Sequence, residues 1–537
     1  LFAVFFVFTA LVFILPSMTS ARYAPSLTWY TVSTKNFIIY YPEGHELTAQ
    51  RVLSLSDEVY KDVTGYLMVQ PRPCPVVLDP GTDLFNGYMA LFPSRISLFE
   101  TPFNTVQGFG PGSDLMDLLF THEYTHYVHI TARLGWYGVI ARIFGDGLAA
   151  SNMVSPGWLI EGITTNAETR FTNGGRGRSA LFKGGMMSFV EGKGLWGLNS
   201  ASVSSPYSPP GYGRIYLAGY SMVEYLNRTY GENAFAGLSR YQALNPFAGS
   251  SRALRKATGK SPKEFYRDFL DDYLEQARLQ KEKAESEGLP SGRVILSDDL
   301  NLTGFETHFW TDKGTILAIR TGYDKRNALI EADPVNGKII KEIKTGTLTN
   351  LSARGLTDGR ILMAEVFYHP LGEGTIDTTD LAIFDPRTRD HKRLTRNEHI
   401  YCADMSPDGN TIVATRRNGM WIDLVLMDAD GGNIRTLIST PGMYFDAPRW
   451  SPDGARIVTV VKSGRNADIA LVDPITGLME LLFGSDMAED NEPEFSPDGK
   501  WVIFSSDRSG TWNIHAWSLT EKKLFQLTSV PYVAGDP

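Results

Sequence analysis

The stretch SPDGARIVTVV, residues 451–461, decides the fold of the second half of this chain. In SPDG the proline fixes φ, the aspartate side chain bonds nearby backbone and the glycine accepts positive φ, so the tetrapeptide specifies a tight turn. The same tetrapeptide occurs at 406–409 and 496–499, a spacing of 45 residues each time. Each copy leads into an alternating run of the kind that forms a β-strand. This periodicity indicates a repeat architecture.

Two weaker copies of the turn, TDKG at 311–314 and LTDG at 356–359, extend the series upstream. After each turn come a strand, a polar turn and a second strand that ends near an aspartate. Four short strands in about 45 residues make one blade of a β-propeller. This stretch resembles the TolB-like propellers, and five blades are predicted within residues 292–537. Because DAP and NEP introduce blades four and five and the chain ends at AGDP, we expect a six-bladed propeller that is incomplete here.

The composition is that of an ordinary globular protein. The 537 residues exceed what one core supports, so two or three domains are expected. The net charge of −9, without a block of Lys or Arg, argues against nucleic acid as a partner. Cys74 and Cys402 fall in different predicted domains, so no disulfide framework is expected.

The N-terminal residues 1–15, LFAVFFVFTALVFIL, are apolar and uncharged and are followed by PSMTSAR. We interpret residues 1–21 as an export signal with cleavage after Ala21. The alternative is a membrane anchor through this segment, although the apolar run is short for a span of about 20 residues. The expected location is therefore outside the cytoplasm, and the resemblance to TolB-like propellers implies a bacterial protein that is periplasmic, cell-surface or secreted.

Residues 22–285 form the predicted first domain. Runs of β-branched and aromatic residues, such as WYTVSTKNFIIYYPEG, precede a region of helical periodicity between Ser113 and Tyr273. Its last helix opens at SPKEF, where Ser261 and Glu264 form a capping box. Residues 286–291 are the predicted linker. The fold class is thus multidomain, with an α+β domain followed by an all-β propeller.

The peptide THEYTHYVHI, residues 121–130, contains the pattern H-E-x-x-H. On a helix His122 and His126 lie on one face and can bind one zinc ion, with Glu123 beside a metal-bound water. The alternative is an ordinary histidine-bearing helix packed in a core, and a third ligand distinguishes the two. We expect His129, which would crowd the site, to lie on its rim or support a ligand. Glu161, within GWLIEGITTNAETR, is the candidate third ligand.

These two motifs resemble those of the gluzincin metallopeptidases, most closely the aminopeptidase-N-like group. The resemblance implies that Glu161 is the third ligand of one Zn²⁺ per chain. The stretch IYLAGYSMVEYLNRTYGENAF is similar to the segment that carries the family's catalytic tyrosine, which corresponds to Tyr216. A phenol there would stabilise the oxyanion of a tetrahedral intermediate. The alternative for Tyr216 is a core aromatic residue. Glu168 also matches an acidic position of the family, where it would orient a ligand.

The sequence departs from this group in two places. GYMAL, residues 87–91, stands where the aminopeptidases have G-x-M-E-N, so Ala90 and Leu91 replace the acidic and amide residues. The anchor for a substrate's free amine is lost, which favours an endopeptidase. The segment LGWYGVIARIFGDGLAASNMV lengthens the gap between His126 and Glu161. It would be a lid, a substrate wall or a membrane-facing surface, but we expect a core-packed helical hairpin.

The sequence thus predicts an exported zinc-dependent peptidase with Glu123 as general base, whose propeller docks a peptide or protein substrate or a protein partner. One alternative is a catalytically silent scaffold that works as a protein-binding module through the propeller. A serine hydrolase is a third reading, but no G-x-S-x-G motif is found. The aspartates of the SPDG turns are explained by turn formation and are not expected to bind metal.

Overall fold

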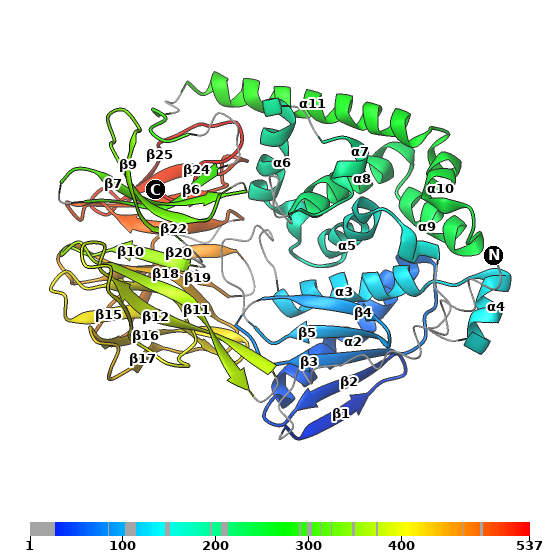
Figure 1. The fold of residues 1–537 in the computed structure, drawn as a ribbon, viewed down its shortest axis with the longest axis horizontal. Helices are drawn as coiled ribbons and strands as arrows, with labels where there is room; N and C mark the ends of the chain where they lie inside the picture. Colours follow the sequence, from blue (N-terminus) through cyan, green and yellow to red (C-terminus); the bar gives the residue numbers. More distant parts are fainter. Residues whose placement is uncertain are drawn as a thin grey trace.

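The computed structural model shows a mixed α+β part followed by a propeller-like set of sheets (Figure 1). It describes residues 27–83, 85–101, 114–144, 151–193, 196–205, 213–288, 292–297, 303–311, 313–323, 325–345, 350–371, 374–463, 466–483 and 487–537. The predicted export signal and residues 289–291 of the predicted linker lie outside these ranges. Among the described helices, none is both long and apolar enough to cross a membrane.

The chain begins with a five-stranded sheet in the order β1-β2-β3-β5-β4. Its strands are β1 (Trp29–Ser33), β2 (Phe37–Pro42), β3 (Cys74–Asp79), β4 (Gly87–Leu91) and β5 (Ser94–Phe99). The three central strands are parallel and the two edge strands are antiparallel to their neighbours. Helices α2 (Glu46–Leu67) and α3 (Leu115–Thr131) pack against this sheet and against each other. The ring of Phe37 on β2 contacts those of Phe120 and Tyr124 on α3, which joins sheet and helix in one core.

A group of helices follows and completes this part of the molecule. They are α4 (Gly135–Phe144), η2 (Ser151–Val154), α5 (Gly157–Phe171), η3 (Arg176–Arg178), α6 (Ala180–Lys193), α7 (Leu198–Ala201), α8 (Arg214–Tyr230), α9 (Ala234–Leu244), α10 (Gly249–Thr258) and α11 (Pro262–Ser286). Helices α5 and α8 approach closely where Gly162 faces Gly219, since a Cβ on Gly162 would lie 2.3 Å from the carbonyl oxygen of Gly219. The predicted start of α11 is confirmed, with Ser261 and Glu264 in a capping box.

The C-terminal strands form consecutive four-stranded antiparallel units. The first is β6 (Thr303–Trp310), β7 (Ile316–Gly322), β8 (Ala328–Ala332) and β9 (Ile339–Thr345), and the second is β10 (Asn350–Gly355), β11 (Ile361–Leu371), β12 (Gly374–Phe384) and β13 (His391–Arg393). The third is β14 (Ile400–Met405), β15 (Thr411–Asn418), β16 (Trp421–Asp428) and β17 (Arg435–Ile438), and the fourth is β18 (Tyr444–Trp450), β19 (Ile457–Lys462), β20 (Ala467–Val472) and β21 (Met479–Leu481). The fifth is β22 (Asp490–Phe495), β23 (Trp501–Ser506), β24 (Asn513–Ser518) and β25 (Lys523–Gln526).

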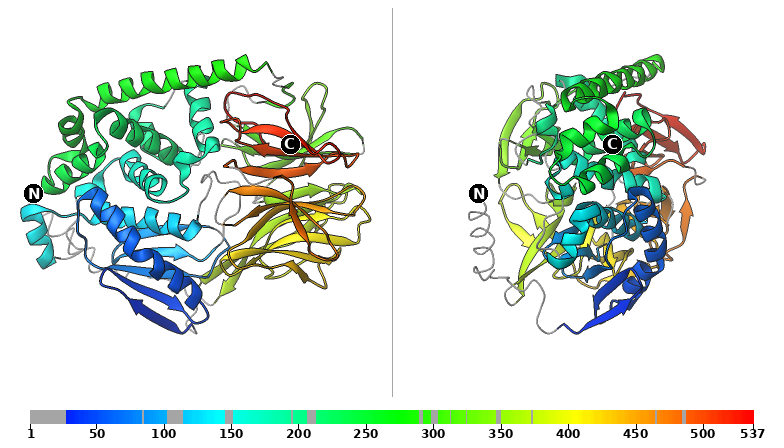
Figure 2. Two further views of the ribbon diagram at one scale, coloured as in Figure 1. Left: turned by 180° about the vertical axis from the view of Figure 1, so that it is seen from behind. Right: turned by 90° about the vertical axis from the view of Figure 1, so that its right-hand side faces the viewer.

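The first strands of these units contact one another in chain order, from β6 through β10, β14 and β18 to β22. This is the arrangement of inner strands in a propeller, and the units follow one another beside the helical part (Figure 2). Arg354 on β10 forms ion pairs with Asp404 on β14 and with Glu494 on β22. Glu494 also pairs with Arg449 on β18, so charged side chains link four of the inner strands.

The SPDG turns have the predicted geometry. Gly409, Gly454 and Gly499 have φ values of 74°, 71° and 68°, in the region that favours glycine. In each turn the aspartate accepts a hydrogen bond from a serine hydroxyl and from the backbone two residues on, as Asp408 does from Ser406 and from the N–H group of Asn410. These carboxylates are occupied by the turn itself.

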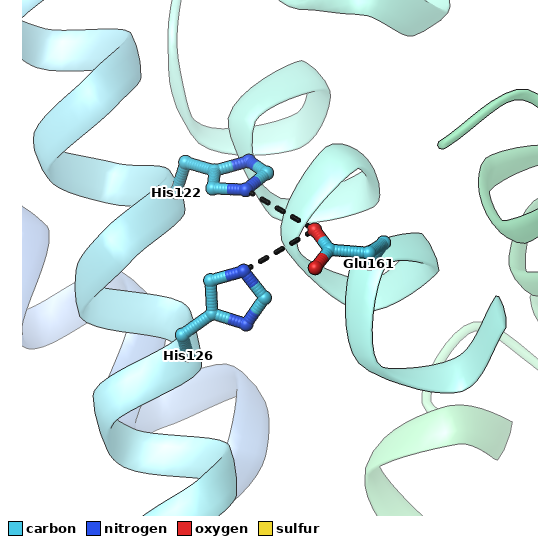
Figure 3. Close-up of side chains that lie close together, drawn as sticks. All are labelled: His122, His126 and Glu161. Carbon is cyan, nitrogen blue, oxygen red and sulfur yellow. Dashed lines mark ion pairs between the residues drawn. The ribbon is translucent and has the colours of Figure 1, made fainter. Parts of the chain in front are cut away.

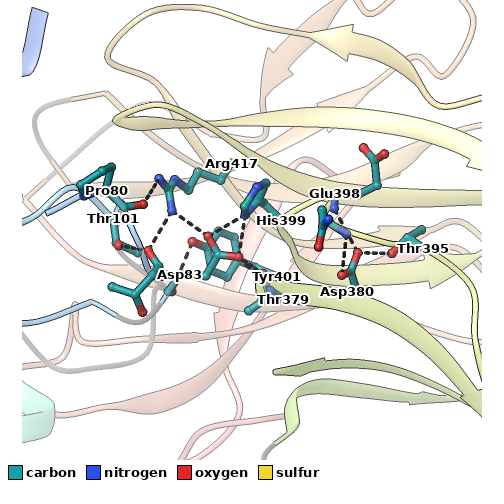
Figure 4. A network of polar contacts seen from close by, with 12 residues as sticks. Pro80, Asp83, Thr101, Thr379, Asp380, Thr395, Glu398, His399, Tyr401 and Arg417 are labelled. Atoms are coloured by element: carbon teal, nitrogen blue, oxygen red, sulfur yellow. Dashed lines mark hydrogen bonds and ion pairs between the residues drawn. The ribbon is translucent and has the colours of Figure 1, made fainter. Parts of the chain in front are cut away.

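A loop of the first sheet is inserted into the propeller (Figure 4). Asp83, which follows β3, is buried and accepts hydrogen bonds from Thr379 at the backbone N–H (2.8 Å) and from His399 Nδ1 (2.8 and 2.9 Å). The guanidinium of Arg417 donates to the Asp83 carboxylate at 2.7 Å and to the carbonyl oxygen of Thr82 at 2.8 Å. We call Asp83, Thr379, His399 and Arg417 the Asp83 latch. It joins the mixed α+β part to the second and third propeller units.

The prediction of a core-packed helical hairpin after His126 is wrong for α4, whereas η2 at the end of the same segment contacts α3 and α9 and buries Asn152. None of the residues of α4 is buried, and its large apolar side chains face solvent. The reason is its position: α4 lies at the end of the molecule opposite the propeller and contacts chiefly α9 (Figures 1 and 2). The apolar composition of α4 had suggested that it packs against the core, but no residue of the helix is buried there.

Candidate metal centre

Helix α3 carries His122, Glu123 and His126 through the interior of the mixed α+β part. The helix begins at Asp114, whose side chain accepts hydrogen bonds from the N–H groups of Met116 (3.0 Å) and Asp117 (3.1 Å). Such an N-cap satisfies backbone donors that have no partner within the helix. From this fixed start, two turns place His122 and His126 on the same side of the helix, both buried (Figure 3).

Helix α5 brings Glu161 to face the two histidines (Figure 3). One carboxylate oxygen of Glu161, Oε2, lies 3.3 Å from His126 Nε2 and 3.6 Å from His122 Nε2. The close packing of α5 on α8 and α3 positions this residue, because it sits between Trp158 and Gly162, both buried against those helices. The structure therefore brings together all three residues that the sequence suggested as metal ligands.

The three ligand atoms suit a zinc ion in spacing and in chemistry. With metal-to-ligand bonds of 2.0–2.2 Å, atoms at the corners of a tetrahedron lie about 3.4 Å apart, close to the two distances observed. Imidazole nitrogen and carboxylate oxygen are both ordinary zinc ligands. Within the described residues Glu123 Oε2 is buried and has no hydrogen-bond partner, and Glu161 Oε2 is buried with only the two imidazole nitrogens beside it. Buried oxygens without a partner are uncommon, and a bound cation and its water would satisfy both.

A buried carboxylate orients the first histidine. Glu168 lies on α5 seven residues after Glu161, on the same face of the helix. It accepts a hydrogen bond from His122 Nδ1 at 2.8 Å, which leaves His122 Nε2 directed toward Glu161. Glu168 is itself held by Arg176, whose backbone N–H donates to Oε1 at 3.0 Å and whose Nη1 lies 3.4 Å from Oε2. Carboxylate support of this kind fixes the tautomer of a metal-binding histidine. No sequence motif marked Arg176, which becomes visible only once η3 is placed against α5.

The charges of the group are strongly coupled. Burial lowers the pKa of His122, but the carboxylates of Glu161 and Glu168 outweigh it and raise that pKa to about 9. Burial raises the pKa of Glu123, opposed by the neighbouring histidines. Burial also acts to raise the pKa of Glu161, yet His126 and His122 hold it well below its usual range.

Tyr216, in the first turn of α8, lies beside the group. Its ring centre is 6.2 Å from that of His122, and the guanidinium carbon of Arg176 lies 4.6 Å from the centre of the same ring. Burial raises the pKa of Tyr216, and the charge of Glu161 raises it further. The phenol therefore stays protonated and can act as a hydrogen-bond donor. The core-aromatic alternative does not describe this environment.

His129 is not part of the group. It is buried against the ring of Phe235, with ring centres 5.5 Å apart, and burial lowers its pKa to about 3. The expectation that it lies on the rim of the site or supports a ligand is wrong, because one further turn of α3 directs it into the core between α3 and α9.

The edge strand β4 runs alongside the histidine helix. A Cβ on Gly87, the first residue of β4, would lie 2.8 Å from Leu119 Cδ1 and 3.2 Å from Glu123 Cγ. Only glycine allows this approach of backbone to helix. Within the described residues β4 pairs with β5 alone, and the face of β4 at Gly87 packs on α3 beside Glu123. The geometry is that of three candidate metal ligands, two of them buried histidines, beside an edge strand and a phenol.

Comparison with known proteins concerns the propeller. Residues 381–531 match the family model described as the TolB beta propeller domain. Solved structures that resemble the chain include TolB from Acinetobacter baumannii, with 22% identity, a TM-score of 0.36 and coverage of 43% of this chain and 56% of that one. Oligogalacturonate lyase from Vibrio parahaemolyticus has 14% identity, a TM-score of 0.31 and coverage of 41% and 64%. The β-propeller domain of the trilobed protease from Pyrococcus furiosus has 13% identity, a TM-score of 0.32 and coverage of 43% and 68%.

No curated protein matches the chain. The chain spans little more than half of the Acinetobacter TolB structure. The C-terminal part thus contains a TolB-like β-propeller domain, as its repeats predicted. For the mixed α+β part, a function is inferred from the arrangement of His122, His126 and Glu161.

Proposed function

We propose that the mixed α+β part is a zinc-dependent peptidase of the gluzincin type. The observation that carries this proposal is the convergence of His122, His126 and Glu161 from two helices, with Glu123 next to them on α3. Packing of an ordinary core helix does not require two imidazoles and a carboxylate oxygen at metal-ligand spacing. It also does not explain a buried carboxylate oxygen, Glu123 Oε2, without a hydrogen-bond partner.

Each residue has a distinct role in peptide-bond hydrolysis. His122, His126 and Glu161 would hold the zinc ion, which when bound would supply a water of lowered pKa and polarise the scissile carbonyl. Glu123, whose pKa is raised by burial, is the general base that accepts the water's proton and passes it to the leaving amine. Tyr216 donates a hydrogen bond to the oxyanion of the tetrahedral intermediate. Glu168 and Arg176 hold His122 in position.

The substrate is an extended peptide bound along β4. Within the described residues the outer edge of this strand pairs with no other strand and offers backbone groups to a further one, and Gly87 packs the strand against α3 beside Glu123. Ala90 and Leu91 carry no group that would capture a free amine, so we favour internal cleavage over removal of an N-terminal residue. The propeller, held to the α+β part through the Asp83 latch, docks the substrate or a protein partner. The apolar N-terminal segment is consistent with an exported enzyme.

The metal test uses the full-length protein and a pair of matched variants. After dialysis against zinc and then buffer, elemental analysis is expected to give about one zinc per chain for the wild type. Glu161→Gln keeps the shape of the side chain and is expected to lose most of the bound zinc. Glu275→Gln, an exposed glutamate of α11 outside the site, is expected to retain it. Equal zinc in both variants would refute the ligand set.

The activity test uses Glu123→Gln. This variant is expected to keep its zinc and to lose hydrolysis of an unfolded protein substrate, because the base is removed while the ligands remain. A zinc-loaded wild type that cleaves no peptide in a broad substrate panel would refute the enzymatic proposal while leaving the metal site intact.

A further inference from the structure

Helix α4 presents large apolar side chains to solvent at one end of the molecule. The exposed fractions are 54% for Trp136, 60% for Val139, 79% for Ile143 and 64% for Phe144, and 87% for Phe247 in the turn between α9 and α10. The rings of Trp136 and Phe247 lie 6.5 Å apart, so the helix and the turn share one surface. We call these five residues the α4 surface.

The apolar side chains of α4 have the spacing of an amphipathic helix. Positions 136, 139, 143 and 144 fall within one stripe, because residues three, four and seven apart lie on the same side of a helix. In most surface helices that stripe faces the core, whereas here the described residues of α4 include none that is buried. The helix contacts chiefly α9, and this contact leaves the stripe exposed, so the stripe itself needs a different apolar environment.

The surroundings of the α4 surface are cationic although the whole chain has a net charge of −9. Residues 131–144 contain two arginines and no acidic residue, and residues 234–263 contain six Lys or Arg and no acidic residue. The cations exposed on α4 and α10 are Arg142, Arg252, Arg255 and Lys256. Helix α10 packs on α9, which in turn contacts α4, so these cations lie on helices at the same end of the molecule as the apolar stripe (Figure 1).

We propose that the α4 surface binds the interface of an anionic lipid bilayer. An apolar stripe with Trp and Phe, bordered by Arg and Lys, is the composition of helices that lie in the headgroup region, where the apolar face enters the acyl boundary and the cations meet anionic lipid. Helix α4 has ten residues, about 15 Å in length, and is too short to span a bilayer. It therefore lies on the membrane. The excess of Lys and Arg over acidic residues at this end of the molecule favours an anionic lipid surface as the partner.

This contact would set the orientation of the molecule. The α4 surface and the propeller lie at opposite ends in two views, so a membrane-bound molecule directs its propeller away from the bilayer (Figures 1 and 2). The proposal does not depend on the metal centre, because no residue of the α4 surface contacts the group at His122. It is also separate from the apolar segment at the N-terminus, which could tether the chain without bringing α4 into contact with lipid.

The experiment places an environment-sensitive dye on the α4 surface of the full-length chain. Ile143→Cys is labelled with a nitrobenzoxadiazole dye, and the native Cys74 and Cys402 are buried and shielded from labelling. Ile475→Cys, an equally exposed isoleucine in a propeller turn, is the matched control. Vesicles of phosphatidylcholine, with and without phosphatidylglycerol, are titrated in, and quenching by spin-labelled lipid reports whether the dye enters the bilayer.

The dye at position 143 is expected to shift to shorter wavelength and to be quenched with phosphatidylglycerol vesicles, less so with phosphatidylcholine alone, while the dye at position 475 stays unchanged. Adding Phe144→Ser and Phe247→Ser is expected to raise the lipid concentration at half-shift by on the order of ten-fold or more for each residue. A dye at 143 that remains in water with anionic vesicles would overturn the proposal.

Two other results would also overturn it. Shielding of the dye without vesicles that grows with protein concentration would mean that a second copy of the chain covers the α4 surface. Shielding without vesicles at every concentration, lost when the chain starts at Arg22, would mean that the protein's own N-terminal segment covers it.

Discussion

Replacing Asp83 with alanine is expected to weaken the contact between the α+β part and the propeller more than any other single substitution in that contact. The carboxylate is buried and accepts hydrogen bonds from three residues of the propeller: Thr379, His399 and Arg417. Its removal leaves the Arg417 guanidinium, largely buried, with neutral partners such as the backbone carbonyls of the loop and without a carboxylate. It also leaves the N–H group of Thr379 without its acceptor.

The magnitude follows from these contacts. Breaking a buried ion pair by removing one partner costs about 3–5 kcal/mol, because the remaining charge stays buried without compensation. Arg417→Met is expected to cost a comparable amount for the same reason. In the double variant no charge is left unpaired at this pair, so the two effects should fall short of additivity by on the order of 1–3 kcal/mol.

The assay is urea unfolding at pH 7, followed by tryptophan fluorescence and by far-ultraviolet circular dichroism. If the wild type unfolds in one transition, a loss of contact between the α+β part and the propeller should divide it into two transitions, one for each part. The control is Glu282→Ala on α11, which removes an exposed ion pair with Arg278 and is expected to leave the unfolding midpoint unchanged, since solvent screens such pairs. A midpoint for Asp83→Ala equal to that of the control, or full additivity with Arg417→Met, would refute the role of the latch.

The same residue predicts a dependence on acid, and three further substitutions test the metal centre. Burial acts to raise the pKa of Asp83, but His399 and Arg417 outweigh it and the pKa is lowered. The contribution of Asp83 to stability is therefore present above the ordinary pKa near 4 and is lost as pH falls through the lowered pKa. The urea midpoints of the wild type and Asp83→Ala should thus converge only in acid. Glu168→Gln is expected to weaken zinc affinity by about 10–100-fold in competition with a chelator, and an unchanged affinity would show that Glu168 does not support His122. Tyr216→Phe is expected to lower kcat by on the order of 100-fold or more with zinc content unchanged, whereas an unaltered kcat would remove it from the oxyanion site. Gly87→Ala presses a methyl group against Leu119 and Glu123 and should reduce hydrolysis, while Gly185→Ala, which has open space around it, should not; equal activity would mean that β4 can shift without consequence.

Local patterns in the sequence were sufficient for the features that depend on nearby residues. The SPDG turns follow from the conformations of proline, aspartate and glycine, and the structure has the expected positive φ at Gly409, Gly454 and Gly499. The capping box at Ser261 and Glu264 is likewise a matter of four adjacent residues. His122 and His126 share a face because a helix repeats every 3.6 residues, which requires no knowledge of the rest of the fold.

Other features depend on which helices, strands and loops pack against one another, and the sequence alone did not predict them. Arg176 contacts the site only because η3 packs on α5. Asp83 is important only because the loop between β3 and β4 contacts propeller residues such as His399, which lies 316 residues later in the chain. The apolar segment containing Ile143 was expected in a core, since composition states that a side chain avoids water and does not state what covers it.

The sequence by itself determined the repeat that builds the propeller and the spacing of residues on the histidine helix, because turn conformation and helical periodicity are properties of a few consecutive residues. The tertiary structure alone decided that Glu161 faces both histidines, that His129 points into the core and that α4 remains exposed. Those outcomes depend on how helices pack against one another, and that packing is set by contacts between residues far apart in the chain.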